Sequence, residues 1–121
     1  MVFRQPRQLQ KGFLFMKISQ WDETLFVEKT ASGVAMVDFF ATWCGPCKAM
    51  MSVLEKVADE FSGQSIEIGK IDIEQFPALA ARFKVRTVPT FIVFKAGEVQ
   101  SSLVGVQSQT ALANALRKAL E

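Results

Sequence analysis

The sequence contains no histidine and no tyrosine, and it has only two cysteines among its 121 residues. The absence of histidine removes the side chain that most often acts as a general base near neutral pH and most often binds metals. Any proton transfer must therefore use aspartate, glutamate, lysine or cysteine. Two cysteines separated by two residues are too few and too close for the disulfide framework of a secreted domain. They fit catalysis or redox sensing in a reducing compartment better.

Long apolar runs and strong charge are also missing. No stretch approaches the roughly 20 apolar residues that a membrane span needs. The net charge is +2, and no run rich in lysine and arginine supports a nucleic-acid partner. Charged residues make up 21% of the chain and apolar residues 50%, which is typical of one globular domain. We therefore expect a monomer without membrane or nucleic-acid partners.

Residues 1–12 differ in composition from the rest of the chain. They are basic, contain no acid and are rich in glutamine. The apolar run that follows is too short for a signal peptide, and no small-residue cleavage site comes after it. We interpret residues 1–12 as a flexible tail and residues 13–121 as the folded domain. A transit peptide and a start at Met16 are the alternatives.

The remaining chain alternates between strand and helix patterns. Residues 34–41 form a nearly continuous apolar run, which is typical of a strand buried on both faces. From Cys47 to Phe61, apolar side chains recur at intervals of three and four, which predicts a helix. The other predicted elements are strands at residues 13–18, 66–71, 90–94 and 99–104, and helices at residues 19–29, 74–83 and from Ser108 onward.

In chain order these elements predict β-α-β-α-β-α-β-β-α. Helices that connect strands imply crossovers and a sheet with helices on both faces. A tight turn at residues 95–98 joins the last two strands into an antiparallel hairpin at the edge. The fold class is therefore α/β, with a central mixed sheet of about five strands flanked by about four helices. The predicted N-caps are Ser19 and Ser108, and the leucines predicted to face inward are Leu112, Leu116 and Leu120.

Cys44 and Cys47 lie between the buried strand and the start of the next helix. Backbone N–H groups at a helix start favour negative charge, and the thiolate is the reactive form of cysteine. We assign Cys44, which precedes the helix, as the nucleophile. Cys47 faces the apolar stripe, and we assign it as the resolving thiol that attacks a mixed disulfide. Gly45 and Pro46 form the turn and are expected to leave Cys44 accessible.

Other interpretations of the cysteine pair stay open. Tetrahedral zinc needs about four nitrogen or sulfur ligands, so this chain could supply only half of a site shared between two chains. An iron–sulfur cluster shared in the same way is a related alternative. A structural disulfide would stabilise little, because the loop that it closes is short. Two inert buried thiols are disfavoured by their position at a helix start. No cofactor and no metal are predicted.

Two segments resemble the signatures of the thioredoxin family. Residues 37–48, which contain Trp-Cys-Gly-Pro-Cys-Lys, resemble its active-site segment, and residues 85–91 resemble its loop with a cis-proline. Gly105 matches a glycine beside the family's substrate groove. The resemblance runs from about residue 18 to residue 120. It implies the thioredoxin fold, the reduction of protein disulfides, disulfide-containing proteins as substrates and a thioredoxin reductase as the partner.

Asp38 interrupts the apolar run of the buried strand. Burial raises the pKa of a carboxyl group, which would make Asp38 a proton acceptor for Cys47. The matching position in the family is a buried aspartate with this role, and Lys70 matches a family lysine near it. A solvent-facing aspartate and a surface lysine are the alternatives. We predict that Asp38→Asn slows disulfide exchange and stabilises the fold.

The resemblance also implies an apolar surface beside the cysteines for extended protein segments. Pro89 is expected to follow a cis peptide bond and to pack against the disulfide, and Val88 is expected to offer backbone hydrogen bonds. Trp43 lies in a loop before a helix, so we expect it to be partly exposed. The predicted substrate-binding residues are Trp43, Gly45, Pro46, Val88, Pro89, Val104, Gly105 and Val106.

Three positions depart from the family pattern. Phe40 stands where many thioredoxins have a second tryptophan. Ser52 stands where many have a proline that kinks the active-site helix, so we expect a straighter helix. Thr87 replaces a common glycine and is expected to narrow the substrate groove.

Two other functions compete with disulfide reduction. The same chemistry could run in the oxidising direction, and the domain could instead be a binding subunit that grips a partner through the groove. By resemblance, Gly-Pro between the cysteines favours reduction. The absence of a clear signal peptide favours a cytoplasmic location, with organelle targeting through residues 1–12 as the alternative.

Overall fold

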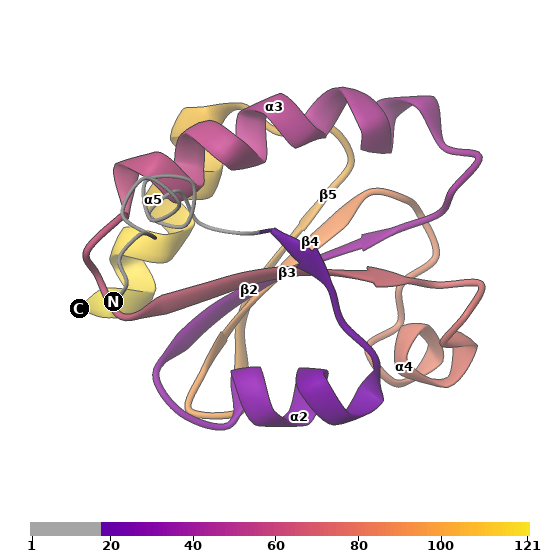
Figure 1. Cartoon of the computed structure of the whole chain (residues 1–121), viewed down its shortest axis with the longest axis horizontal. Coiled ribbons are helices and arrows are strands. Elements are labelled where there is room, and N and C mark those ends of the chain that lie inside the picture. The colour runs from indigo at the N-terminus through magenta and orange to yellow at the C-terminus, as the bar shows by residue number, and fades with distance from the viewer. Residues whose placement is uncertain (1–17) are drawn as a thin grey trace, which may run out of the picture.

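The computed structural model describes residues 18–121, which form a five-stranded sheet with helices on both faces (Figure 1). The strands lie in the order β1-β3-β2-β4-β5. The predicted α/β fold with a central mixed sheet is confirmed. The strands are β1 (Ser19–Gln20), β2 (Val34–Phe40), β3 (Ile66–Asp72), β4 (Thr90–Lys95) and β5 (Glu98–Val104), and the helices are α2 (Glu23–Thr30), α3 (Gly45–Glu60), α4 (Pro77–Arg82) and α5 (Gln109–Leu120).

β2 lies in the middle of the sheet, where every one of its residues is buried. It pairs in parallel with β3 and antiparallel with β4. The sequence analysis predicted antiparallel pairing only between the last two strands. This was wrong, because β4 is also antiparallel to β2. α4 has 6 residues and rises only about 9 Å, whereas the 7 residues of β3 span about 23 Å. The chain therefore enters β4 from the end where β3 finishes.

The two faces of the sheet carry separate cores. α3 and α5 cover one face, and α2 and α4 cover the other (Figure 1). Met36 of β2 packs in the core under α3, whereas Val37 and Phe39 pack on the opposite face. Because side chains alternate along a strand, Asp38 faces the same side as Met36. The fold thus directs Asp38 toward the layer that contains α3.

The first strand and the start of the first helix differ from the sequence-based prediction. Ser19 belongs to β1, which pairs in parallel with β3. Asp22 is the N-cap of α2, and its carboxylate accepts a hydrogen bond from the N–H of Leu25 at 2.8 Å. The prediction of Ser19 as the cap was wrong, because β1 and Asp22 move the helix start toward the C-terminus. The tail predicted at residues 1–12, and all but Ile18 of the first predicted strand, lie outside the described residues.

The later elements follow the prediction more closely. Ser108 caps α5, and its hydroxyl accepts a hydrogen bond from the N–H of Ala111 at 3.0 Å. Leu120 is 37% exposed, however, and Ala119 takes the inward position in the last turn. α3 runs through Ser52 as one helix, and its straightness stays a prediction. Within residues 18–121, no helix has both the length and the apolar character to cross a membrane.

Gly69 of β3 makes room for the ring of Trp21, which is buried against the sheet. A Cβ added at Gly69 would overlap that ring. Overpacking of this kind costs about 1–3 kcal/mol, so we expect Gly69→Ala to lower the free energy of unfolding by that amount. Equilibrium unfolding in urea measures the loss.

Gly45→Ala is the matched control for Gly69→Ala, because a Cβ added at Gly45 meets nothing within 4 Å. We expect its free energy of unfolding to stay within about 0.5 kcal/mol of the wild-type value. Equal losses in the two variants would contradict the packing argument.

Candidate active site

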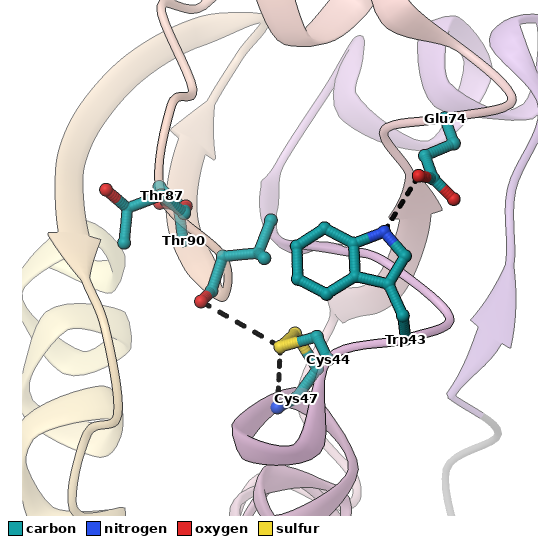
Figure 2. The surroundings of a disulfide bond; sticks show 7 residues. Trp43, Cys44, Cys47, Glu74, Thr87 and Thr90 are labelled. Atoms are coloured by element: carbon teal, nitrogen blue, oxygen red, sulfur yellow. Dashed lines mark hydrogen bonds between the residues drawn. A yellow bond between two sulfur atoms is a disulfide. The ribbon is translucent and has the colours of Figure 1, made fainter.

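Cys44 and Cys47 form a disulfide at the N-terminus of α3 (Figure 2). Their Cα atoms are 5.3 Å apart. Cys44 is the N-cap of the helix, and the backbone N–H of Cys47 donates a hydrogen bond to its Sγ atom at 3.1 Å. The first turn of α3 contains no acidic residue that would oppose negative charge there. This position favours a thiolate at Cys44 when the pair is reduced.

The cysteine pair is covered by a loop that lies far away in the sequence. Cys44 and Cys47 are each only 3% exposed, so the expectation of an accessible Cys44 was wrong for the disulfide form. Val88 packs against the pair, and its carbonyl oxygen is 3.9 Å from Sγ of Cys44 (Figure 2). The Val88–Pro89 peptide bond is cis, as predicted. Phe40, Ala41 and Ile73 also pack around the pair, whereas Gly45 in the turn is exposed.

Trp43 is 66% exposed beside the disulfide, which confirms the expected exposure. Its Nε1–H donates a hydrogen bond to Oε2 of Glu74 at 2.8 Å (Figure 2). Glu74 follows β3, and β2 and β3 are parallel, so the segments after both strands meet at one edge of the sheet. The sequence analysis missed Glu74. Its position directly after a strand parallel to β2 was the signal that could have identified it.

The segment after β5 is tied to the loop that carries the cis-proline. The N–H of Gly105 donates a hydrogen bond to the carbonyl oxygen of Pro89 at 2.8 Å. Gly105 has a φ of +86°, a conformation that glycine adopts without steric cost. Val104 and Val106 are 59% and 65% exposed. Pro89 itself is buried, and its part in the predicted apolar surface stays a prediction.

Asp38 is fully buried on the side of β2 that faces the α3 layer. Neither of its carboxylate oxygens has a hydrogen-bond partner among the described residues. Burial raises the pKa of Asp38 from 3.8 to about 7, and the positive charge of Lys70 offsets part of this rise. Such a carboxyl group exchanges a proton readily near neutral pH.

Lys70 of β3 is the register partner of Asp38. Its side chain is half-buried, and its ammonium nitrogen lies 4.2 Å from the centroid of the Phe40 ring. The predicted proximity of Lys70 to Asp38 is therefore confirmed. Phe40, one of the three residues that depart from the family pattern, supplies the aromatic face that this ammonium group contacts.

Among residues 18–121, no three histidine, cysteine, aspartate or glutamate side chains gather as ligands for a metal ion. The structure instead shows a disulfide at a helix N-terminus and a buried carboxyl group on the strand that leads into it. This combination can perform dithiol–disulfide exchange.

Comparison with known proteins agrees with this chemistry. The sequence model of the family described as Thioredoxin matches residues 14–118. The chain belongs to the thioredoxin family. It is 45% identical over 105 residues to the thioredoxin of Staphylococcus haemolyticus, and the match covers 87% of this chain and 100% of that protein.

Solved thioredoxin structures have the same fold. A mutant thioredoxin from Halobacterium salinarum NRC-1 has a TM-score of 0.78 and 32% identity, over 88% of this chain and 92% of that chain. The thioredoxin of Malassezia sympodialis has a TM-score of 0.78 and 30% identity, over 88% and 93% of the two chains. The predicted thioredoxin fold is confirmed, and the protein is a thiol–disulfide oxidoreductase of this family.

Proposed function

We propose that this protein reduces disulfide bonds in other proteins and that a thioredoxin reductase returns it to the dithiol form. The observation that carries the proposal is the position of Cys44, whose Sγ accepts the N–H of Cys47 at the start of α3. A thiolate stabilised there is a nucleophile for disulfides. We further propose that the protein acts as a cytoplasmic monomer. The comparisons lend no support to the alternative of organelle targeting.

The reaction proceeds by two exchanges. The Cys44 thiolate attacks one sulfur of a substrate disulfide, forms a mixed disulfide and releases the other substrate sulfur as a thiolate. Cys47 then loses its proton and attacks Sγ of Cys44, which releases the second substrate sulfur. Two electrons pass to the substrate, and the pair is left as the Cys44–Cys47 disulfide.

Asp38 is the proposed acceptor of the Cys47 proton. It lies on the face of β2 that carries the α3 core, Cys47 is buried in the first turn of α3, and the chain has no histidine for this step. A pKa of about 7 leaves a large fraction of Asp38 ionised at neutral pH. Lys70 supports that ionised fraction through its positive charge. We therefore propose Asp38 as the base and Lys70 as the residue that lowers the pKa of this base.

Extended segments of a substrate protein are proposed to bind the apolar surface next to Cys44. Trp43, Val104 and Val106 supply large exposed apolar side chains. Val88 contributes backbone groups beside the sulfur, and extended peptides bind such groups with little selection of side chains. The exposed turn of Gly45 and Pro46 completes the proposed surface.

Thr87 lies beside this surface and is itself exposed. Its carbonyl oxygen accepts a hydrogen bond from Oγ1 of Thr90 at 2.6 Å, which ties the loop to the start of β4. Narrowing of the groove by the Thr87 side chain stays a prediction.

The direction of the reaction is tested by the redox equilibrium of the cysteine pair. We expect the pair to become reduced only in buffers where glutathione is almost entirely in its thiol form, because a disulfide reductant needs a potential below that of the glutathione pool. Alkylation of free thiols followed by mass spectrometry gives the reduced fraction. A midpoint in oxidising buffers would reverse the proposed direction.

The roles of the two cysteines are tested by trapping. Cys47→Ser is expected to accumulate a mixed disulfide with a disulfide-containing protein through Cys44, because no resolving thiol remains. Cys44→Ser is the matched control and is expected to trap little. Non-reducing electrophoresis and mass spectrometry identify the adduct. Equal trapping by both variants would contradict the assignment, and full biological function of the double variant would favour a binding role.

The pKa of Asp38 predicts how stability depends on pH. The folded protein holds a proton on Asp38 up to about pH 7, whereas the unfolded chain loses it near pH 3.8. Stability should therefore fall as the pH rises from about 4 to about 7 and then level off. Asp38→Asn removes this loss of stability. We therefore expect the free energy of unfolding of the variant to exceed that of the wild type by up to about 4 kcal/mol above pH 7. Urea unfolding of both oxidised proteins at several pH values measures the difference.

The control for Asp38→Asn is Asp59→Asn, which changes an exposed aspartate of α3. We expect this variant to follow the wild-type stability profile within about 0.5 kcal/mol. Asp38→Asn should also slow disulfide exchange at neutral pH, because the proposed base is absent. If Asp38→Asn is more stable than the wild type but exchanges disulfides at the wild-type rate, the proton-transfer role of Asp38 is excluded. The effect of its burial on stability would still hold.

A further inference from the structure

A pocket of about 250 Å³ opens beside Cys47, and the proposed binding of protein substrates does not use it. It lies where the end of β2, the first turns of α3 and one side chain of β3 meet. None of the residues proposed to bind protein substrates lines this pocket. The lining residues that matter here are Phe40, Ala41, Cys47, Lys48, Met51 and Lys70.

We propose that this pocket binds a small aromatic carboxylate. A cavity of about 150 Å³ holds a benzene molecule, so a pocket of this size has room for a bicyclic ring. The ring of Phe40 and the side chains of Ala41 and Met51 provide apolar walls for such a ring system. Aromatic rings and thioether sulfur make favourable contacts of this kind.

The charge of the ligand follows from the two lysines of the pocket. Lys48 and Lys70 line it, and no aspartate or glutamate does. Neither lysine takes part in the ion pairs formed by residues 18–121, and residues 1–17 contain no acid. The acid whose charge acts on Lys70 is the buried Asp38, which does not line the pocket. The ammonium group of Lys70 rests on Phe40 and has three N–H donors, so a carboxylate can bind at the edge of the ring.

A ligand in this position would act on the second step of the reaction, a consequence that rests on the proposed function. It would cover Cys47 from the solvent side. Its negative charge would also offset the support that Lys70 gives to ionised Asp38. Resolution of the mixed disulfide by Cys47 should slow, whereas the first attack by Cys44 takes place on the other side of the pair.

The binding itself is tested on the oxidised protein by NMR titration with 1-naphthoate. We expect saturable shifts of the backbone amides of Ala41, Thr42 and Met51, with a dissociation constant of about 1 mM, as a ligand of this size would give. The uncharged analogue 1-naphthalenemethanol should bind at least about fivefold more weakly, because it cannot pair with the lysines. Absence of shifts at the pocket, or equal binding of the two compounds, would overturn the proposal.

Two lysine variants make the test specific. Lys70→Met should weaken 1-naphthoate binding at least about fivefold and leave binding of the alcohol unchanged. Lys95→Met is the matched control, because Lys95 is exposed at the end of β4 and does not line the pocket. Equal weakening by both variants would show that only net charge matters and would overturn the site.

The NMR titration needs no catalytic turnover, so its outcome is independent of the proposed function. Failure to bind 1-naphthoate by a protein that still reduces disulfides would reject the pocket alone. Binding by a protein that does not reduce disulfides would keep the pocket and reject the proposed function.

Discussion

The burial of β2 in the centre of the sheet is the constraint on which the active site depends. Its apolar residues pack against cores on both faces, and the chain leaves the strand directly into the loop that carries Trp43 and Cys44. α3 then returns over one face of the same strand, which places Cys47 and Asp38 in the same layer. The position of both sulfurs therefore follows from the packing of one strand and one helix, and the loop between them only has to turn the chain.

The same burial makes an ionised Asp38 unfavourable for the stability of the fold. A carboxylate without a hydrogen-bond partner in the core opposes folding when it is ionised, and Lys70 relieves this only in part. The other side chains of β2 are apolar, and any of them could fill this place in a purely structural strand. A buried acid at this position fits the proposed proton acceptor, because an exposed carboxyl group would ionise well below pH 7.

Sequence reasoning succeeded where the signal is local and failed where distant segments meet. The apolar run of β2, the helical spacing after Cys47 and the hairpin before Glu98 depend on neighbouring residues, and all three appear in the structure. The cover that Val88 places over Cys44 depends on tertiary contacts that no local pattern encodes. The direction of β4 depends on the shortness of α4, which the sequence analysis predicted as a longer helix at residues 74–83. The family signature still predicted the cis bond at Pro89, because the motif carries information that periodicity does not.

The two sulfurs face different environments, and this division matches the order of the chemistry. Cys44 lies beside Val88 near exposed apolar side chains such as Trp43, where a polypeptide can approach. Cys47 lies beside a pocket with the half-buried Lys70 on its wall, which is too small for a folded partner but open to solvent and small molecules. In the proposed reaction, attack on a protein disulfide uses one side of the pair, and proton release before resolution uses the other. A small ligand could consequently affect resolution without competing with the protein substrate for its surface.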